Sequence, residues 1–298
     1  MLLLADFTSV CYTLIDKSEF VGGLQMSTEE SAFNPRIRLK DEWRKSLIDY
    51  PFGEIKDDSV RISYQSMQAP ELMNIVEKLH VADFYNGETD FQKMLALMDY
   101  VHGISCKDGN HTSPAIMNTD EIMKVAELGQ LWCWDYATVL TEMLLSMGVK
   151  AVTVTCIPRL FDYDHHVGVM AYLSNSAKWV FLDPTFNTYF YGKEPMDIFE
   201  IRSAYAQGNA PKFRHITIQK NWKLILHNIE YDDYDSWYSD YMLKNMFRFI
   251  LPKNSAYSCR TSNAETVFLL PNGYNTRNEY DDLKDSCYTF DIGCVLQS

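Results

Sequence analysis

The sequence reads Gly129-Gln130-Leu131-Trp132-Cys133-Trp134-Asp135-Tyr136-Ala137 near its centre, and an apolar segment from Thr138 to Met147 follows directly. Apolar residues recur in this segment at helical spacing until Gly148, a residue type that often ends helices. Cys133 then stands at the start of a buried helix. Unpaired backbone N–H groups and the helix dipole lower the pKa of a thiol in that position. Cys133 is therefore a candidate nucleophile, although many cysteines are simply small core residues.

Two extended segments downstream carry a histidine and an aspartate. The first follows Asp162-Tyr163-Asp164-His165-His166, the second spans Lys178 to Thr185, and Ser174-Asn175-Ser176 joins them. This arrangement places a histidine early on one strand and Asp183 at the end of the next. A thiol, an imidazole that takes its proton and a carboxylate that fixes the ring tautomer form the triad used in acyl transfer.

Composition narrows the class of protein. The 298 residues carry a formal net charge of −13, and 47% of them are hydrophobic, which predicts a globular chain with a sizeable core. Clustered lysines and arginines are missing, so we expect no nucleic-acid partner and no anionic membrane partner. The seven scattered cysteines fit a reducing compartment. With no signal-like or membrane-spanning run visible, the sequence predicts a cytoplasmic location.

Hydrophobic patterns divide the chain into three predicted parts. Residues 1–85 read as a β-rich segment with a packing helix from Pro70, residues 86–205 as a catalytic core, and residues 206–298 as a β-rich extension. The predicted strands of the outer parts are Val10 to Ile15, Ser59 to Ser66, Arg214 to Ile218, Lys223 to Ile229, Met246 to Leu251 and Thr266 to Leu270. The acidic and aromatic stretch 231–241 reads as a solvated face over packed rings.

Taken together, these features resemble the transglutaminase-like superfamily. The likeness covers about residues 86 to 190, and its most specific part is Trp179-Val180-Phe181-Leu182-Asp183-Pro184-Thr185, a tryptophan four residues before Asp-Pro-Thr. The resemblance implies an α+β fold with a papain-like core, wrapped by the N- and C-terminal β-rich extensions. It also implies a triad in which Cys133 is the nucleophile, His166 the general base and acid, and Asp183 the orienting carboxylate. His166 is preferred to His165 because it keeps the family's register along the strand.

The sequence departs from that family around the site. The aromatic residue usually found two positions after the histidine is Gly168 here, so the wall behind the histidine must differ. The backbone N–H of Cys133 is one expected oxyanion donor. The second donor stays open among Gln130, Trp132 and Asn110. The expected cleft-lining residues are Trp134, His165, Gly168 and Trp179.

Two other classes of function stay open beside a thiol enzyme. Asp162, Asp164, His165 and His166 offer oxygen and imidazole ligands for a hydrolytic metal site, but adjacent strand residues point to opposite faces. The fold also occurs in binding modules without chemistry.

We expect a cysteine hydrolase or acyltransferase that acts on an amide or peptide carbonyl through a thioester. Hydrolysis is slightly favoured, and amide formation with an amine acceptor is the alternative. The substrate is a peptide, a protein or a small amide, and we expect no cofactor and no metal. The sequence does not define the oligomeric state.

Overall fold

The helix that begins at Cys133 lies at the centre of the molecule. The computed structural model describes residues 35–52, 61–105, 112–159, 165–217, 233–259, 265–274 and 287–289. In it, α6 spans Cys133–Ser146, and every residue of the helix except Trp134 is buried. A helix that is covered on all sides belongs to the interior of a domain, as the apolar sequence predicts.

Shorter helices surround α6. Helices α2 (Pro70–Leu79), α4 (Asp90–His102) and α5 (Thr119–Val125) pack against it, and α3 (Val81–Phe84) lies against α2 and α4. The residues at the N-terminus of each helix explain where the helix begins. Pro70 occupies the first turn of α2, where its missing N–H costs nothing. Thr89 begins α4 with a capping box, and the Asn118 side chain caps α5.

Eight strands of the described residues form one sheet in the order β10-β9-β7-β2-β3-β4-β5-β6. Neighbouring strands are antiparallel except for β10 and β9. Their bounds are Ala151–Ile157 for β2, His166–Leu173 for β3, Lys178–Asp183 for β4, Thr188–Tyr191 for β5, Lys212–His215 for β6, Arg248–Pro252 for β7, Thr266–Leu269 for β9 and Cys287–Thr289 for β10. Strands β1 (Ser63–Tyr64) and β8 (Asn254–Ser255) form a separate parallel pair.

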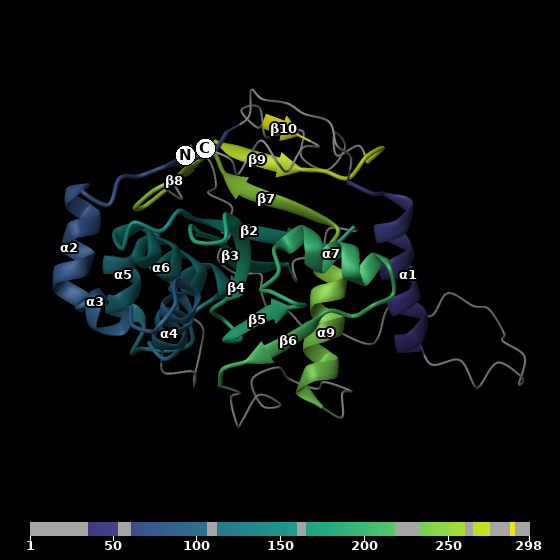
Figure 1. Cartoon of the computed structure of the whole chain (residues 1–298), viewed down its shortest axis with the longest axis horizontal. Coiled ribbons are helices and arrows are strands. Elements are labelled where there is room, and N and C mark those ends of the chain that lie inside the picture. The colour runs from purple at the N-terminus through teal and green to yellow at the C-terminus, as the bar shows by residue number, and fades with distance from the viewer. Residues whose placement is uncertain are drawn as a thin grey trace, which may run out of the picture.

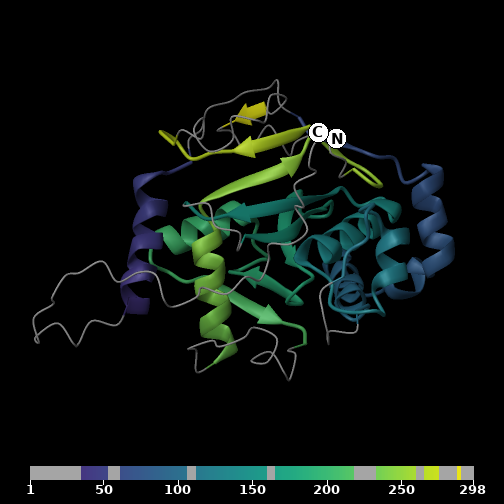
Figure 2. The ribbon, with the colours of Figure 1, turned by 180° about the vertical axis from the view of Figure 1, so that it is seen from behind.

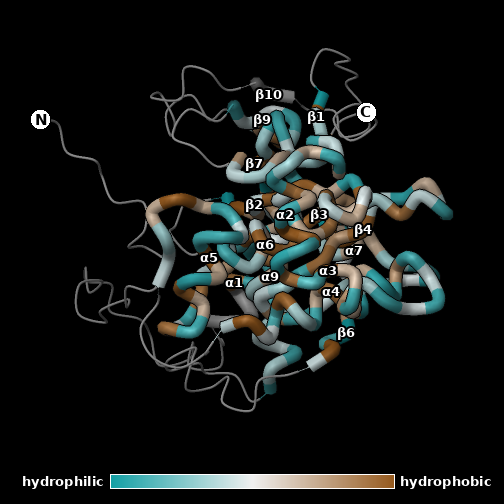
Figure 3. The backbone as a smooth tube through the Cα atoms, turned by 90° about the vertical axis from the view of Figure 1, so that its left-hand side faces the viewer, coloured by the Kyte–Doolittle hydropathy of each residue, from teal (hydrophilic) through white to brown (hydrophobic). Residues whose placement is uncertain are grey.

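The sheet separates two groups of helices. Helices α2 to α6 lie on one side of it, and α1 (Pro35–Asp49), α7 (Ile198–Ala206) and α9 (Tyr234–Asn245) lie on the other, as the front and back views show (Figures 1 and 2). The backbone is most hydrophobic where α6 meets β2 and β3 between these layers (Figure 3). Strand β2 is buried at every position because helices cover both faces of the sheet there.

Two parts of the predicted organisation are wrong. Residues 35–49 form helix α1 and residues 234–245 form helix α9, although both fall in segments predicted to be β-rich. Strands β6, β7 and β9 also continue the sheet of the core, so the predicted extension shares that sheet. The predicted strands at Val10 to Ile15 and Lys223 to Ile229 lie outside the described residues, and the three-part division stays a prediction. The α+β architecture is as expected.

No helix in the described part of the chain has the length and apolar composition needed to cross a membrane.

The buried carboxyl group of Glu142, a residue of α6, forms hydrogen bonds with two other segments of the chain. Glu142 is 1% exposed, and its two oxygens accept hydrogen bonds from the backbone N–H groups of Thr119 and Ser258, each at 2.8 Å. Burial raises the pKa of Glu142 from its ordinary 4.5 to about 7. The folded protein therefore holds this proton more tightly than the unfolded chain does.

We expect Glu142 to make stability pH-dependent. Between about pH 4.5 and pH 7 the unfolded chain releases the proton and the folded protein keeps it, so the Glu142 contribution falls as pH rises. Relative to Glu142→Gln, the wild-type free energy of unfolding should decrease by about 2–3 kcal/mol across that window and then level off. Urea denaturation at several pH values measures this difference, with the exposed Glu127→Gln as a charge control. Parallel curves for wild type and Glu142→Gln would contradict the prediction.

Candidate active site

His166 and Asp183 form a buried pair at one end of the sheet. His166 is the first residue of β3 and Asp183 the last residue of β4, and the antiparallel register brings these two strand ends together. Nε2 of His166 lies 2.7 Å from Oδ2 of Asp183, and both side chains are almost completely buried. Two of the three predicted triad residues are therefore in hydrogen-bond contact.

The Asp183 carboxylate receives four hydrogen bonds. Oδ1 accepts from the backbone N–H groups of Thr185 at 3.1 Å and Phe186 at 3.2 Å, while Oδ2 accepts from His166 and from the Tyr238 hydroxyl at 2.8 Å. The first oxygen thus begins the turn after β4, as aspartate often does. The second oxygen orients the imidazole, so one side chain serves both purposes. The four donors hold both oxygens of Asp183 in fixed positions.

This geometry fixes the tautomer of His166. An ionised carboxylate only accepts, so the neutral ring donates from Nε2 and carries its lone pair on Nδ1. The ring is also held from two sides, since Phe186 stacks on it with centroids 5.2 Å apart and Tyr241 meets it edge-on at 5.4 Å. Nδ1 is therefore the atom of His166 that is suited to accept a proton.

Cys133 occupies the first position of α6 and is 8% exposed. The backbone N–H groups in the first turn of a helix point toward its N-terminal end. The segment before it is fixed by Asp135, whose Oδ2 accepts from the backbone N–H of Trp132 at 2.8 Å and from the Ser113 hydroxyl at 2.7 Å. The thiol therefore sits on a rigid helix start, where the helix dipole favours negative charge.

Strand alternation restricts where Cys133 and His166 meet. Val167 and Val169 belong to the core cluster of α6, whereas Met170, on the face of His166, belongs to the cluster of α9. By this pattern the thiol and the imidazole belong to opposite faces of the sheet. They can meet only at the start of β3, where the sheet ends. By the same alternation, His165 falls on the α6 side. The contact of Cys133 with His166 stays a prediction.

Two of the three candidates for the second oxyanion donor have backbone groups in other hydrogen bonds. The backbone N–H of Trp132 is engaged with Asp135. Gln130 is half-buried, and its backbone carbonyl accepts from the N–H of Thr112 at 2.8 Å. Asn110 lies outside the described residues. The second donor therefore stays a prediction.

Two of the four predicted cleft-lining residues do not lie at an open site. Gly168 is buried, and a Cβ atom there would come within 2.4 Å of the Phe181 ring, so Phe181 fills the space of the missing aromatic. Trp179 is four residues from Asp183, about 13 Å along the strand. It packs against Tyr64 and Tyr172 at centroid distances of 6.0 and 5.3 Å.

The other two predicted cleft residues, Trp134 and His165, are half-buried. The backbone carbonyl of His165 accepts from the Tyr241 hydroxyl at 3.4 Å. Of the predicted metal-ligand set, Asp162 and Asp164 lie outside the described residues, and His166 is already bound to Asp183. The cleft-lining role of Trp134 and His165 stays a prediction.

Sequence reasoning missed two buried side chains that support the pair. Tyr238 reaches Asp183 from α9, and His102 of α4 donates from Nδ1 to the backbone carbonyl of Pro184 at 3.0 Å. The spacing of Tyr234, Trp237 and Tyr241 along an acidic stretch matches a helical face and could have revealed α9.

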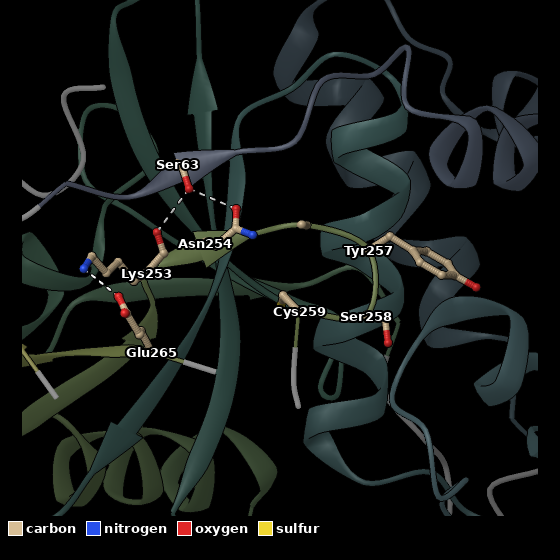
Figure 4. A pocket seen from close by; sticks show the side chains of 8 residues that line it. Ser63, Lys253, Asn254, Tyr257, Ser258, Cys259 and Glu265 are labelled. Carbon is tan, nitrogen blue, oxygen red and sulfur yellow. Dashed lines mark hydrogen bonds and ion pairs between the residues drawn. The ribbon is translucent and has the colours of Figure 1, made fainter. Parts of the chain in front are cut away.

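A separate pocket of about 570 Å³ lies beside the β1–β8 pair (Figure 4). Its walls hold an ion pair between Lys253 and Glu265 at 2.6 Å and a hydrogen bond from Ser63 to Asn254 at 2.9 Å. The Tyr257 hydroxyl, also in its lining, donates to Asp120, and the predicted triad residues are not among the lining residues. The candidate site at the ends of β3 and β4 is thus separate from this pocket.

Comparison with known proteins gives one family match and one solved structure. Residues 80–184 match the model of the transglutaminase-like superfamily, a segment of about a third of the chain that includes Cys133, His166 and Asp183. A solved structure from Cytophaga hutchinsonii, which carries the name "Putative Cysteine Protease", is similar at 20% identity with a TM-score of 0.29. The match covers 38% of this chain and 37% of that one, so the chain spans little more than a third of that structure. No curated protein matches the sequence. Residues 80–184 thus form a transglutaminase-like core.

Proposed function

We propose that the protein is a cysteine enzyme that transfers acyl groups from an amide or peptide carbonyl. The observation that supports this most is the buried His166–Asp183 pair at 2.7 Å, in the same family-matched segment as a cysteine at a helix start. A buried carboxylate–imidazole pair of fixed tautomer prepares a ring nitrogen to take a proton. A thiol at a helix N-terminus is a suitable proton donor and nucleophile.

The proposed reaction has two halves. Sγ of Cys133 attacks the carbonyl carbon and its proton passes to Nδ1 of His166, which gives a tetrahedral oxyanion. Collapse of this intermediate breaks the carbon–nitrogen bond, and the imidazolium proton leaves with the amine. Water then attacks the thioester, His166 takes a proton from it, and the carbon–sulfur bond breaks to release a carboxylic acid and the thiol. The Cys133 backbone N–H is the first proposed oxyanion donor.

We place hydrolysis first because water is always present, and an amine acceptor is the alternative for the second half. The two differ in the product, which is a carboxylic acid in one case and a new amide in the other. The proposed substrate is a peptide, a protein or a small amide. The scattered, odd number of cysteines supports a reducing compartment for this thiol chemistry.

We expect Asp183→Asn to lower the acylation rate by about 10³- to 10⁴-fold. Asparagine keeps an oxygen for the turn N–H groups of Thr185 and Phe186, so the fold should survive. Its amide N–H₂ facing Nε2 would favour the tautomer with the proton on Nδ1, which no longer accepts from the thiol. Thermal denaturation and single-turnover acylation of a model amide or ester measure the two properties. A folded Asp183→Asn protein with a near-wild-type rate would reduce the triad to a dyad.

A further inference from the structure

Helix α9 supports the His166–Asp183 pair from outside the segment that matches the family model. The hydroxyl of Tyr238 donates to Oδ2 of Asp183 at 2.8 Å, and Tyr238 is completely buried. One turn further along, the ring edge of Tyr241 contacts His166. The same helix therefore contacts both members of the pair.

We propose that Tyr238 is a positioning residue of the active site, whose hydroxyl holds Oδ2 of Asp183 toward His166. This inference rests on the proposed function, because it concerns how the same histidine is prepared to accept the thiol proton. Tyr238 acts through Asp183 and has no role as a catalytic residue of its own.

The shared oxygen explains why this hydroxyl matters. Oδ2 accepts from both His166 and Tyr238, whereas the backbone donors of the turn bind Oδ1. Without Tyr238, the imidazole would be the one remaining hydrogen-bond donor that the structure gives to Oδ2. A hydrogen bond to a buried charged group is among the stronger ones in proteins, so its loss weakens the positioning of Oδ2 and of the imidazole that donates to it.

Packing leaves the Tyr238 ring little freedom. Phe190 stacks on it with centroids 5.8 Å apart, and Phe213 and Phe186 meet it edge-on at 5.2 and 5.4 Å. Burial and the charge of Asp183 raise the pKa of Tyr238 well above its usual value. The hydroxyl therefore keeps its proton and acts as a donor to the carboxylate.

The charge of Asp183 also acts on two further titratable groups, Cys156 and His215. Cys156 on β2 is fully buried, and burial followed by the charge of Asp183 raises the pKa of its thiol well above the usual value. His215 on β6 has its pKa lowered by burial, a shift that nearby Asp235 and Asp183 oppose, and its Nδ1 bonds the Thr188 hydroxyl. Both shifts favour neutral side chains near neutral pH, so neither group supplies a counter-charge to Asp183.

The test compares Tyr238→Phe with Tyr205→Phe. Each variant loses one hydroxyl from a buried ring of the same core cluster, but the Tyr205 hydroxyl donates to the backbone carbonyl of Ser239 at 3.0 Å. The readout is the rate of Cys133 alkylation by iodoacetamide from pH 4 to 9, followed by peptide mapping. We expect Tyr238→Phe to move the acid limb of this profile up by about one pH unit and to slow alkylation at neutral pH by about three- to ten-fold. Tyr205→Phe should keep the wild-type profile.

A second variant covers the case in which Tyr238→Phe does not fold. Incorporation of 3-fluorotyrosine at position 238 keeps the ring and makes the hydroxyl a stronger donor, so the acid limb should move to lower pH. Profiles of both Tyr238 variants that superimpose on wild type would overturn the positioning role. If Asp183→Asn still removed the fast alkylation, the proposed function would stand without it. A wild-type Cys133 that reacts no faster than a free thiol would instead overturn the proposed function and this inference together.

Discussion

Replacing Cys133 by alanine abolishes acyl transfer in our account, with a rate loss of about 10³-fold or more. The substitution removes the sulfur that forms the thioester, and groups that remain at such sites retain only a small residual catalysis. The fold should persist, because a small, nearly buried side chain is shortened by one atom at a helix start. Steady-state turnover and thermal denaturation of the same preparation measure both outcomes.

Cys156→Ala is the matched control for this experiment. Cys156 lies opposite His166 across the β2–β3 pair, so it is close to the same imidazole. It is completely buried, and its raised pKa keeps it a thiol, which makes it unreactive. We expect Cys156→Ala to retain activity. Loss of activity in Cys156→Ala together with retention in Cys133→Ala would show that Cys156 on β2, and not Cys133, is the nucleophile.

The second large effect separates the two adjacent histidines. We expect His166→Ala to lose the chemistry and the fast alkylation of Cys133 near neutral pH, because it removes the ring that Asp183 orients. His165→Ala should keep most of the activity, because the backbone carbonyl of His165, which accepts from the Tyr241 hydroxyl, is retained in alanine. Turnover and alkylation rates are measured for both variants at pH 7.

This comparison also tests the strand geometry. His165 lies by alternation on the side of α6, whereas His166 has the carboxylate partner. The account therefore predicts a large loss in one variant and a small loss in the other. Equal losses would show that both rings act at the site, and a larger loss in His165→Ala would reverse our assignment.

Local signals in the sequence predicted the core well. The helix from Cys133, the capped helix from Asp90 and the strands that start at His166 and Lys178 all have strong periodicity and clear end residues. The pairing of His166 with Asp183 followed from the resemblance to a family and from strand alternation. These are short-range patterns, or patterns between neighbouring strands, which a single sequence can reveal.

Long-range packing escaped the same reasoning. The Tyr238 hydroxyl reaches Asp183 across 55 positions of the chain, and nothing local in the acidic stretch around it indicates that partner. Phe181 fills the space above Gly168 because the two lie on adjacent strands, a compensation visible only when the register is known. Helix α1 was missed because its sequence is polar and charged, with little apolar periodicity.

The central claim is that Cys133 forms a covalent acyl-enzyme, and intact-mass spectrometry tests it most directly. The wild-type protein is incubated with an activated acyl ester or a peptide amide library, and the reaction is quenched in acid. Its intact mass is measured before and after treatment with hydroxylamine, which cleaves thioesters. We predict one added acyl group that peptide mapping places on Cys133, that hydroxylamine removes and that Cys133→Ala lacks. An adduct on another residue, or the same adduct in Cys133→Ala, would contradict the account.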